Sequence, residues 1–408
     1  MNNQMEYVAN NYLTKDKLIY KGVSSRENFD DYWSSLQLNR RSTAKQVPLL
    51  SKTEIKFWYN ITDETKENIF EIEELGRDKI EDIIPDDVKN EALVESLIDE
   101  AFSSSWIEGA YSTRKRAHEM IKNDLDPKNK SEKMILNNYE GLMYTLENID
   151  SDIDKDYMVR LWKILTKETL EDDEITEAYR DDQVYIHKGS EIIYEGPVAD
   201  EVDQMMEDLY SYIDQYDLES PIVKACIIHY YFVYVHPFFD GNGRTARALM
   251  NLFLIKSGYE FFKYFSISKI LTEKRKQYYA AIENCEANDG DLTYFIDFYT
   301  KLLLDTMKSI RKTYLGHFGK KVIMDLFYDL DIILNDRQEK IVSTLFKSDK
   351  KLIDVKEYTK KYKVVQETAR KDLQELVDLG VLKRIKRGKK YIFKLEDLQV
   401  IVDRIKEL

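Results

Sequence analysis

One helix-length segment, residues 221–239, is apolar on almost every side and sets the plan of the fold. It reads PIVKACIIHYYFVYVHPFF, with Pro221 in its first turn and Pro237 at a position that cannot continue a helix. A helix that is apolar all round has to be buried by other helices. Glycine and proline are scarce, at 14 and 6 of 408 residues, and apolar residues recur at helical spacing through the middle of the chain. We therefore predict a mainly α protein with this helix at its centre.

A short stretch between Tyr179 and Pro197 breaks the helical pattern. Two apolar runs, 184–186 and 192–194, flank the sequence His-Lys-Gly-Ser at 187–190, which predicts a β-hairpin with a glycine-containing turn. A lone hairpin is marginally stable unless it packs on something. We expect it either to dock against the helices or to act as a movable cover for a site.

The dodecapeptide HPFFDGNGRTAR, residues 236–247, follows the central helix directly. The loop after Pro237 leads into a second helical pattern, which places Gly241, Asn242 and Gly243 at a helix N-terminus. Unpaired backbone N–H groups and the helix dipole attract anions there, and the absence of side chains lets an anion approach closely. This predicts a phosphate cradle.

The side chains around this turn have matching chemistry. Arg244 and Arg247 can contact phosphate oxygens, and Asp240 can hold a Mg²⁺ ion that bridges them. His236 is a base that titrates near neutrality and can take a proton from an attacking hydroxyl. The set suits transfer of a phosphate-linked group from a nucleoside triphosphate to an alcohol; the alternative is an ordinary helix corner, capped by Asn242, with solvated arginines.

The stretch also resembles the Fic family motif HxFx(D/E)GNGRxxR, and the resemblance covers roughly residues 90–310. The eight defined positions are filled by His236, Phe238, Asp240, Gly241, Asn242, Gly243, Arg244 and Arg247. The resemblance implies transfer of AMP from MgATP to a Ser, Thr or Tyr hydroxyl of a target protein, or of the chain itself. ATP and Mg²⁺ are thus the expected cofactors.

The resemblance also assigns roles to individual residues. His236 would be the general base, Asp240 the Mg²⁺ ligand, Gly241, Asn242 and Gly243 the anion hole, and the two arginines the phosphate-tail ligands. The hairpin would be a target-docking flap, and two tyrosines would line the nucleotide pocket, although they fit a hydrophobic core equally well. The flap residues are Val184, Tyr185, Ile186 and His187, and the tyrosines are Tyr278 and Tyr279.

A second motif lies ahead of this core, in SSSWIEGA at residues 103–110. Ser104, Glu108 and Gly109 resemble the family's inhibitory pattern (S/T)xxxE(G/N). The resemblance implies that Glu108 pairs with Arg247 and allows ATP to bind only unproductively. The simpler interpretation is a solvated glutamate before a glycine that ends a helix.

The C-terminal residues 336–408 differ from the rest in charge, with 20 Lys and Arg against 13 Asp and Glu in a chain of net charge −14. Three helical patterns are followed by a hairpin that turns at Gly388, and the second and third helices cover Val355–Tyr362 and Gln366–Leu379. This order predicts a winged helix-turn-helix. Six cations lie in the predicted wing: Lys383, Arg384, Lys386, Arg387, Lys389 and Lys390.

We predict that residues 355–393 bind DNA, with docking to a protein or a solvated helical appendage as the alternatives. The predicted domains are an N-terminal region at 1–90, a Fic domain at 91–320 and a winged helix-turn-helix at 330–408. Two cysteines without metal-ligand spacing and no apolar run of membrane-spanning length favour a cytoplasmic protein without a membrane partner.

Two other functions are compatible with the sequence: a DNA-binding regulator whose Fic core only senses nucleotide, and an enzyme that removes AMP. The family also includes members that transfer phosphate or UMP; the complete GNGR turn favours AMP transfer over phosphate transfer, and the donor nucleotide and the direction of the reaction are left open. Whether the chain forms a homodimer, and which protein it modifies, are left open.

Overall fold

The computed structural model describes residues 12–21, 29–77, 86–188, 191–215, 219–348, 350–388 and 390–406. The chain forms two compact units, one of residues 1–74 and 93–306 and one of residues 75–92 and 307–408. The domain boundaries inferred from the sequence stay predictions. No helix in the described ranges combines the length and the apolar character needed to cross a membrane.

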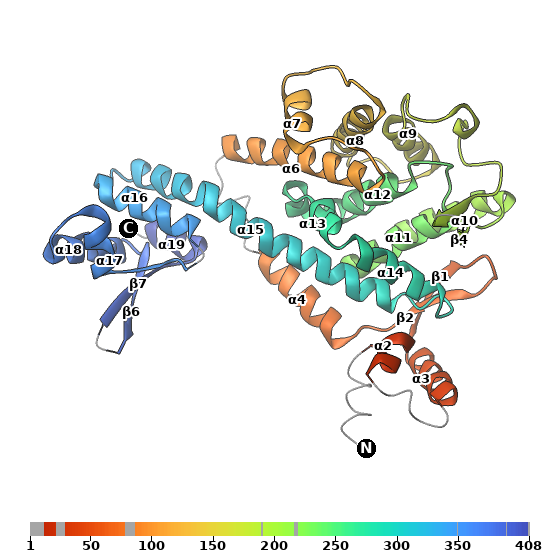
Figure 1. Ribbon diagram of the computed structural model, residues 1–408, viewed down its shortest axis with the longest axis horizontal. Helices are drawn as coiled ribbons and strands as arrows, with labels where there is room; N and C mark the ends of the chain where they lie inside the picture. Colours follow the sequence, from red (N-terminus) through yellow and green to blue (C-terminus); the bar gives the residue numbers. More distant parts are fainter. Residues whose placement is uncertain are drawn as a thin grey trace. The chain divides into compact units, whose positions relative to one another are not determined.

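The first unit is mainly helical, as predicted, with two short hairpins (Figure 1). Besides α4 (Asp63–Arg77), whose last three residues belong to the second unit, the helices α6 (Asp86–Ile107) and α15 (Thr293–Asp329) also continue across a unit boundary. The remaining elements of this unit are α2 (Lys15–Tyr20), α3 (Phe29–Ser42), β1 (Lys45–Leu50), β2 (Lys56–Tyr59), α7 (Arg114–Lys122), α8 (Lys130–Glu147), α9 (Lys155–Leu165), η2 (Asp172–Glu174), β3 (Tyr185–Lys188), β4 (Glu191–Glu195), α10 (Ala199–Asp214), α11 (Pro221–Val235), α12 (Asn242–Lys256), η3 (Glu260–Tyr264), α13 (Ile267–Glu273) and α14 (Arg275–Glu286).

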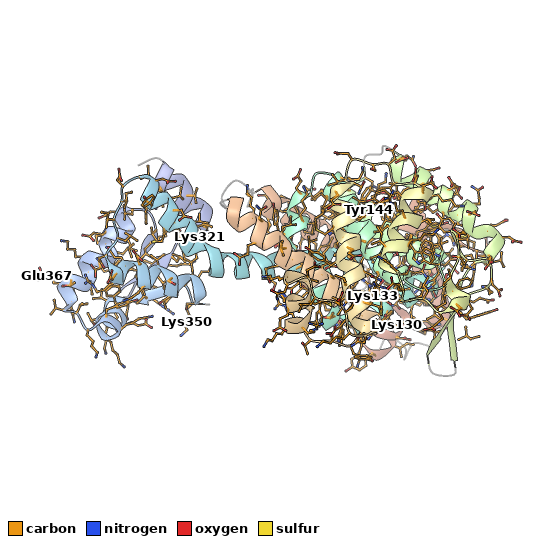
Figure 2. All side chains as sticks on the ribbon, turned by 90° about the horizontal axis from the view of Figure 1, so that it is seen from above. Lys130, Lys133, Tyr144, Lys321, Lys350 and Glu367 are labelled. Carbon is orange, nitrogen blue, oxygen red and sulfur yellow. The ribbon has the colours of Figure 1, made fainter. Side chains whose placement is uncertain are left out.

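Helices α11 and α12 form the centre of this unit (Figure 1). Nearly every side chain of α11 is buried, which confirms the prediction from its all-round apolar sequence, and Pro221 is its first helical residue. The N-terminal half of α12 is equally buried, although it contains Arg244 and Arg247. Two arginines in a helix of the core need partners within the protein or a bound anion. Helix α8 packs against α12 and extends from Lys130 past Tyr144, and these two side chains are marked in Figure 2.

The N-terminal hairpin β1–β2 is a feature that the sequence did not predict. Backbone N–H groups of Trp58 and Leu292 donate to the carbonyls of Gly290 and Trp58 at 3.2 and 2.8 Å, which joins β2 to the turn before α15. The side chain of Thr293 accepts from the backbone of Asn60 at 2.9 Å. These bonds tie residues separated by more than 230 positions, so the hairpin is part of the helical unit.

The predicted hairpin at 179–197 is present as the antiparallel pair β3–β4. It is docked at its base: the Tyr194 hydroxyl donates to the backbone carbonyl of Tyr234 in α11. The aliphatic side chains of Ile192 and Ile193 are 53% and 42% exposed, so the outer part of the hairpin remains open to solvent. The hairpin therefore has an anchored end and an accessible end.

The second unit contains the predicted winged helix-turn-helix. Its antiparallel sheet has the strand order β5-β7-β6, and the side chains of Arg337 and Tyr358 donate to the buried carboxylate of Asp372 at 2.8 and 2.9 Å, which fixes α16 and α17 to α18. Strand β5 and helix α19 were not predicted. The elements are α16 (Asp336–Lys347), β5 (Leu352–Asp354), α17 (Val355–Tyr362), α18 (Gln366–Asp378), β6 (Leu382–Arg387), β7 (Lys390–Leu395) and α19 (Leu398–Lys406).

Candidate active site at the start of α12

His236 ends α11 in a left-handed backbone conformation, with φ of 51°. Its Nδ1 lies 3.3 Å from the carbonyl oxygen of Val233, an acceptor, so Nδ1 carries the proton and Nε2 carries the free lone pair. Burial is the main cause that lowers the pKa of His236 to about 4. The ring is therefore neutral at pH 7 and can accept a proton.

The loop after His236 is clamped from both sides. The Asn242 side chain accepts from the backbone N–H of Phe238 at 3.0 Å and donates to its carbonyl at 2.7 Å. Trp162 of α9 stacks on the Phe238 ring at 4.3 Å and donates from Nε1 to the carbonyl of Asp240 at 2.8 Å. The N-cap position of α12 is Gly241 and no side chain caps it, so Asn242 does not cap the helix as the simpler alternative predicted, and instead holds the loop that follows His236.

The turn requires glycine at positions 241 and 243 for different structural reasons. Gly241 has φ of 87°, and a Cβ there would lie 2.7 Å from Cγ2 of Thr166, so this glycine serves the backbone and the packing. A Cβ on Gly243 would instead overlap the carboxylate of Glu108. Gly243 therefore leaves room above the first turn of α12, and Glu108 occupies that room.

Glu108 reaches this place from the end of α6. Its Oε1 accepts from Nη2 of Arg247 at 2.9 Å. Arg247 also donates to the hydroxyl and the carbonyl of Ser104, at 2.8 and 3.0 Å, and is buried, whereas the Glu108 side chain is 27% exposed. Gly109 follows with φ of 89°, which lets the chain leave the helix. Arg247 is thus in contact with Glu108, as expected, and also with Ser104.

Arg244 points elsewhere, although it is only three positions from Arg247. Its fully buried guanidinium donates to the carbonyl of Leu165 at 2.8 Å and to Oδ2 of Asp240 at 3.2 Å. The other oxygen of Asp240 accepts from the backbone N–H of Gly241 at 2.6 Å. In this structure Arg244 thus orients Asp240 and the end of α9, and phosphate binding by Arg244 stays a prediction.

Comparison with known families agrees with this geometry. A family model described as the Fic/DOC family matches residues 152–254, and one described as a DeoR-like helix-turn-helix domain matches residues 337–394. The chain carries a Fic domain.

Three relatives illustrate the extent of the likeness. Protein adenylyltransferase fic-1 of Caenorhabditis briggsae is 40% identical over 127 residues, which are 30% of this chain and 22% of the relative. Protein adenylyltransferase Fic of Nematostella vectensis is 32% identical over 159 residues, 38% of this chain and 34% of the relative. The crystal structure of a Fic family protein from Desulfovibrio desulfuricans G20 has a TM-score of 0.53 at 20% identity, covering 83% of this chain and 97% of that chain, and shows the shared fold.

The chain spans only about a fifth to a third of the length of these curated relatives. The likeness is thus to their Fic domains.

The two tyrosines expected at the nucleotide pocket of the Fic domain lie in different surroundings. Tyr278 is buried, and its hydroxyl lies 2.9 Å from Nε2 of His229. Tyr279 is 39% exposed, with its ring 5.2 Å from that of Tyr278. Tyr278 therefore belongs to the core, and nucleotide binding by the pair stays a prediction.

The flap of the Fic domain is described except at its tip. Tyr185 and Ile186 belong to β3, Tyr185 is 45% exposed, and the carbonyl of Val184 accepts from the N–H of Gly196. His187 pairs with Ile192 in the strand register, but its side chain lies outside the described residues, as do Gly189 and Ser190. Target docking by these residues stays a prediction.

Arg180 is a residue of the Fic domain that sequence reasoning missed. It is 2% exposed, and it donates to the carbonyls of His236, Pro197 and Asp182 at 2.9, 2.6 and 2.8 Å. One guanidinium thus connects the backbone at His236, the proposed general base, to the residues on either side of the β3–β4 hairpin. A lone arginine before the hairpin carries no sequence signal for this role, because all of its acceptors are backbone carbonyls.

Proposed function

We propose that this chain transfers AMP from ATP to a hydroxyl of a protein, its own hydroxyls included, and that Glu108 represses the reaction. The observation that carries the proposal is the juxtaposition of a neutral histidine with a glycine-lined helix start whose open space holds a carboxylate. A place that accepts the Glu108 carboxylate has the shape and the backbone donors to accept a phosphate.

His236 acts as the general base in this reaction. Its Nε2 takes the proton of the target hydroxyl as the hydroxyl oxygen attacks the α-phosphorus of ATP. A new P–O bond forms to the target, the bond between the α-phosphorus and the bridging oxygen breaks, and pyrophosphate leaves with the electron pair. Backbone N–H groups at the start of α12 stabilise the charge that develops on the phosphate oxygens.

The residues present fit a magnesium ion. Asp240 offers a carboxylate that is 38% exposed, next to the phosphate cradle, and Mg²⁺ in nucleotide sites takes one or two carboxylates together with phosphate oxygens. The described residues contain no cluster of three or more metal-ligating side chains, so Asp240 would share the ion with the substrate. When bound, the ion would neutralise phosphate charge.

Repression follows from the position of Glu108. Its carboxylate takes a hydrogen-bond donor of Arg247 that a phosphate would otherwise use, and it repels the triphosphate. Loss of this side chain leaves Arg247 buried beside the cradle, with the contacts to Ser104 intact. An anionic ligand would then be the natural partner for its guanidinium.

The test is a labelling assay on the full chain. We expect Glu108→Gly to increase incorporation of label from ATP labelled at the α-phosphate into the protein, and His236→Ala in that background to abolish it. Glu119→Gln, which changes a half-exposed glutamate on α7, is the matched control and should leave labelling at the unmodified level. Intact mass identifies the adduct, and labelling that is the same with and without Glu108 would refute the repression.

A second function, DNA binding, is favoured for the second unit. The third helix α18 presents Arg370 and Lys371 to solvent, and Arg384, Lys386 and Arg387 are exposed on the wing strand β6. This is the arrangement in which a recognition helix and a basic hairpin contact the groove and the phosphates of a duplex.

A further inference from the structure

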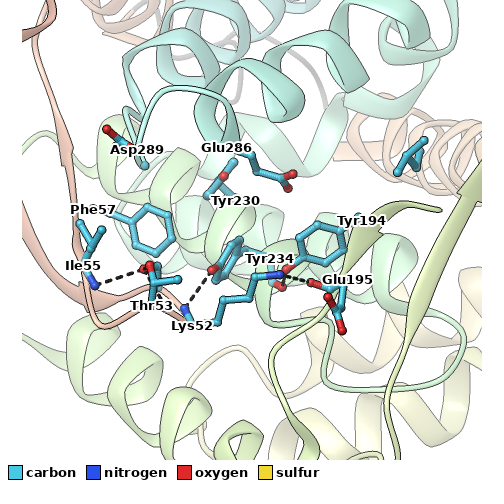
Figure 3. A pocket seen from close by; sticks show the side chains of 13 residues that line it. Lys52, Thr53, Ile55, Phe57, Tyr194, Glu195, Tyr230, Tyr234, Glu286 and Asp289 are labelled. Atoms are coloured by element: carbon cyan, nitrogen blue, oxygen red, sulfur yellow. Dashed lines mark hydrogen bonds between the residues drawn. The ribbon is translucent and has the colours of Figure 1, made fainter. Parts of the chain in front are cut away.

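A cavity outside the candidate active site lies in the first unit, between the loop that joins β1 and β2, strand β4, helix α11 and the turn after α14 (Figure 3). Its volume is about 330 Å³, close to the lower end of the range for sites that hold small ligands or single side chains. None of its lining residues belongs to the motif at 236–247 or to the inhibitory segment. The function proposed above therefore leaves this cavity without a role.

Two polar groups in the wall lack a hydrogen bond to any described residue. The residue Tyr230 is only 1% exposed, and its buried hydroxyl has no hydrogen bond. The carboxylate of Glu286, beside it in Figure 3, is half-buried and receives no hydrogen bond from a described side chain; the ammonium group of Lys52 acts on it electrostatically but donates its hydrogen bond to the carbonyl of Glu195. A buried hydroxyl left unpaired is costly, and the adjacent Glu286 carboxylate can still accept hydrogen bonds, so the two point to a ligand that pairs with them.

The charge and the walls of the cavity select the kind of ligand. Three acidic residues, Glu195, Glu286 and Asp289, are among the lining residues, against one basic residue, Lys52. Lys52 is held at the rim, since its Nζ donates to the backbone carbonyl of Glu195 at 2.7 Å and lies 5.5 Å from the Tyr194 ring. An excess of negative charge favours a cation and disfavours an anion such as a nucleotide.

Aromatic rings complete the lining. Phe57, Tyr194, Tyr230 and Tyr234 surround the space, and Phe57 packs edge-on against Tyr230 and Tyr234 at centroid distances of 5.8 and 5.1 Å. Aromatic faces attract guanidinium and ammonium groups and also bury the aliphatic part of a long basic side chain. The lining thus fits an arginine or lysine side chain better than a free metal ion, which would need more oxygen ligands.

The cavity lies close to the β3–β4 flap and to His236, the proposed general base. Strand β4 contributes Tyr194, whose hydroxyl donates to the carbonyl of Tyr234, two residues before His236. Tyr230 and His236 are separated by six positions of one helix, about 9 Å along its axis. An extended peptide covers that distance in about three residues. A substrate segment lying along the flap could thus reach both places at once.

We propose that this cavity receives a basic side chain of the target protein, about three residues from the hydroxyl that is modified. The proposal rests on the function proposed above, because it makes the cavity a specificity site for the same reaction. Glu286 and the Tyr230 hydroxyl bind the cationic head, and the aromatic rings hold its stem. Acceptor segments with a nearby arginine or lysine are selected, and acidic segments are rejected.

The first experiment measures binding alone and does not depend on AMP transfer. N-acetylarginine methylamide and its neutral analogue N-acetylcitrulline methylamide are titrated into the full chain by calorimetry. We expect saturable binding of the arginine compound only, weakened about tenfold in Glu286→Gln and in Tyr230→Phe. Glu283→Gln, an exposed position one turn earlier on α14, is the matched control and should bind as the unmodified chain does. Equal binding by Glu286→Gln, or none by the unmodified chain, would overturn the proposal.

The second experiment asks whether the bound cation belongs to a substrate. Peptides with one Ser, Thr or Tyr and a randomised flank are incubated with ATP and the Glu108→Gly chain, and the modified peptides are sequenced. We expect enrichment of Arg and Lys about three positions from the acceptor, and loss of that enrichment in Glu108→Gly/Glu286→Gln at similar thermal stability.

The two experiments separate the possible failures. Binding of the arginine compound without any peptide modification would sink the AMP transfer and leave the cavity a cation site. Peptide modification without a basic preference would overturn the specificity role, and would leave free amines as the occupants of the cavity.

Discussion

At the scale of single residues, the protonation of His236 decides when the proposed reaction can run. The folded protein lowers the pKa of this imidazole to about 4 through burial, against an ordinary value of 6.5. A base with a lowered pKa loses its proton-accepting form only in acid, so the reaction should not respond to the pH range in which an exposed histidine titrates.

We predict that the initial rate of self-labelling by the Glu108→Gly chain is nearly constant from pH 8 to 6 and falls below about pH 5, as His236 becomes protonated. The rates are measured at fixed ionic strength, with far-ultraviolet circular dichroism at each pH to confirm that the fold persists. A rate that halves near pH 6.5 would contradict burial as the controlling influence on His236.

The residues of the site differ in how well the sequence revealed them. His236, Gly243 and Glu108 belong to contiguous motifs; the Glu108 carboxylate lies against Gly243, and its charge acts on His236. Arg180 and Trp162 act on the loop through backbone carbonyls, which every residue has. Because such acceptors leave no pattern of residue types, contacts of this kind could not be predicted from the sequence.

At the scale of elements, Arg180 connects the end of α11 to the β3–β4 hairpin. The last carbonyls of a helix have no partner within it, and a cation at that end satisfies them and complements the dipole. Arg180 donates to the carbonyl of His236 at this helix end, and its other hydrogen bonds are to the carbonyls of Asp182 and Pro197, which flank the hairpin. The position of the base and the anchoring of the flap thus depend on one side chain.

We predict that Arg180→Ala lowers the free energy of unfolding by about 3 kcal/mol, because it leaves several buried carbonyls unpaired. It should also reduce self-labelling in the Glu108→Gly background more than the stability loss explains, since His236 would lose its fixed orientation. Arg180→Lys, which keeps the charge and fewer of the bonds, should be intermediate in both measurements. Urea unfolding and initial labelling rates are compared at a temperature at which each variant is folded.

The helices and the hairpins were not equally predictable. Residues 221–256 and 355–378 carry continuous apolar periodicity, and their helices appear where expected, to within a residue or two. The β1–β2 hairpin has no such signal, because its stability comes from bonds of Trp58 and Asn60 to residues 290–293. Strand β5 is three residues long and exists by pairing with β7. Elements that are stabilised by residues distant in the sequence cannot be predicted from local sequence patterns.

At the scale of the whole molecule, the uneven charge distinguishes the two proposed activities. The chain as a whole has a net charge of −14, whereas residues 336–408 carry a surplus of basic residues. The rest of the chain is acidic and repels the phosphates of nucleic acid, so any affinity for DNA should come from the second unit. Its wing residues Lys386 and Arg387 are exposed.

We predict that the full chain binds duplex DNA with an affinity that falls steeply with salt, because phosphate contacts release counterions. Lys386→Ala and Arg387→Ala should each weaken binding and reduce the slope of log K against log salt by about one. Lys340→Ala, at an exposed position of α16 away from the wing, is the control and should leave the slope unchanged. Fluorescence anisotropy at several salt concentrations measures all four proteins. If the full chain fails to bind any duplex at low salt, or the wing variants bind as tightly as the control, the basic hairpin does not contact DNA, which leaves docking to a protein and a solvated helical appendage as the two alternatives.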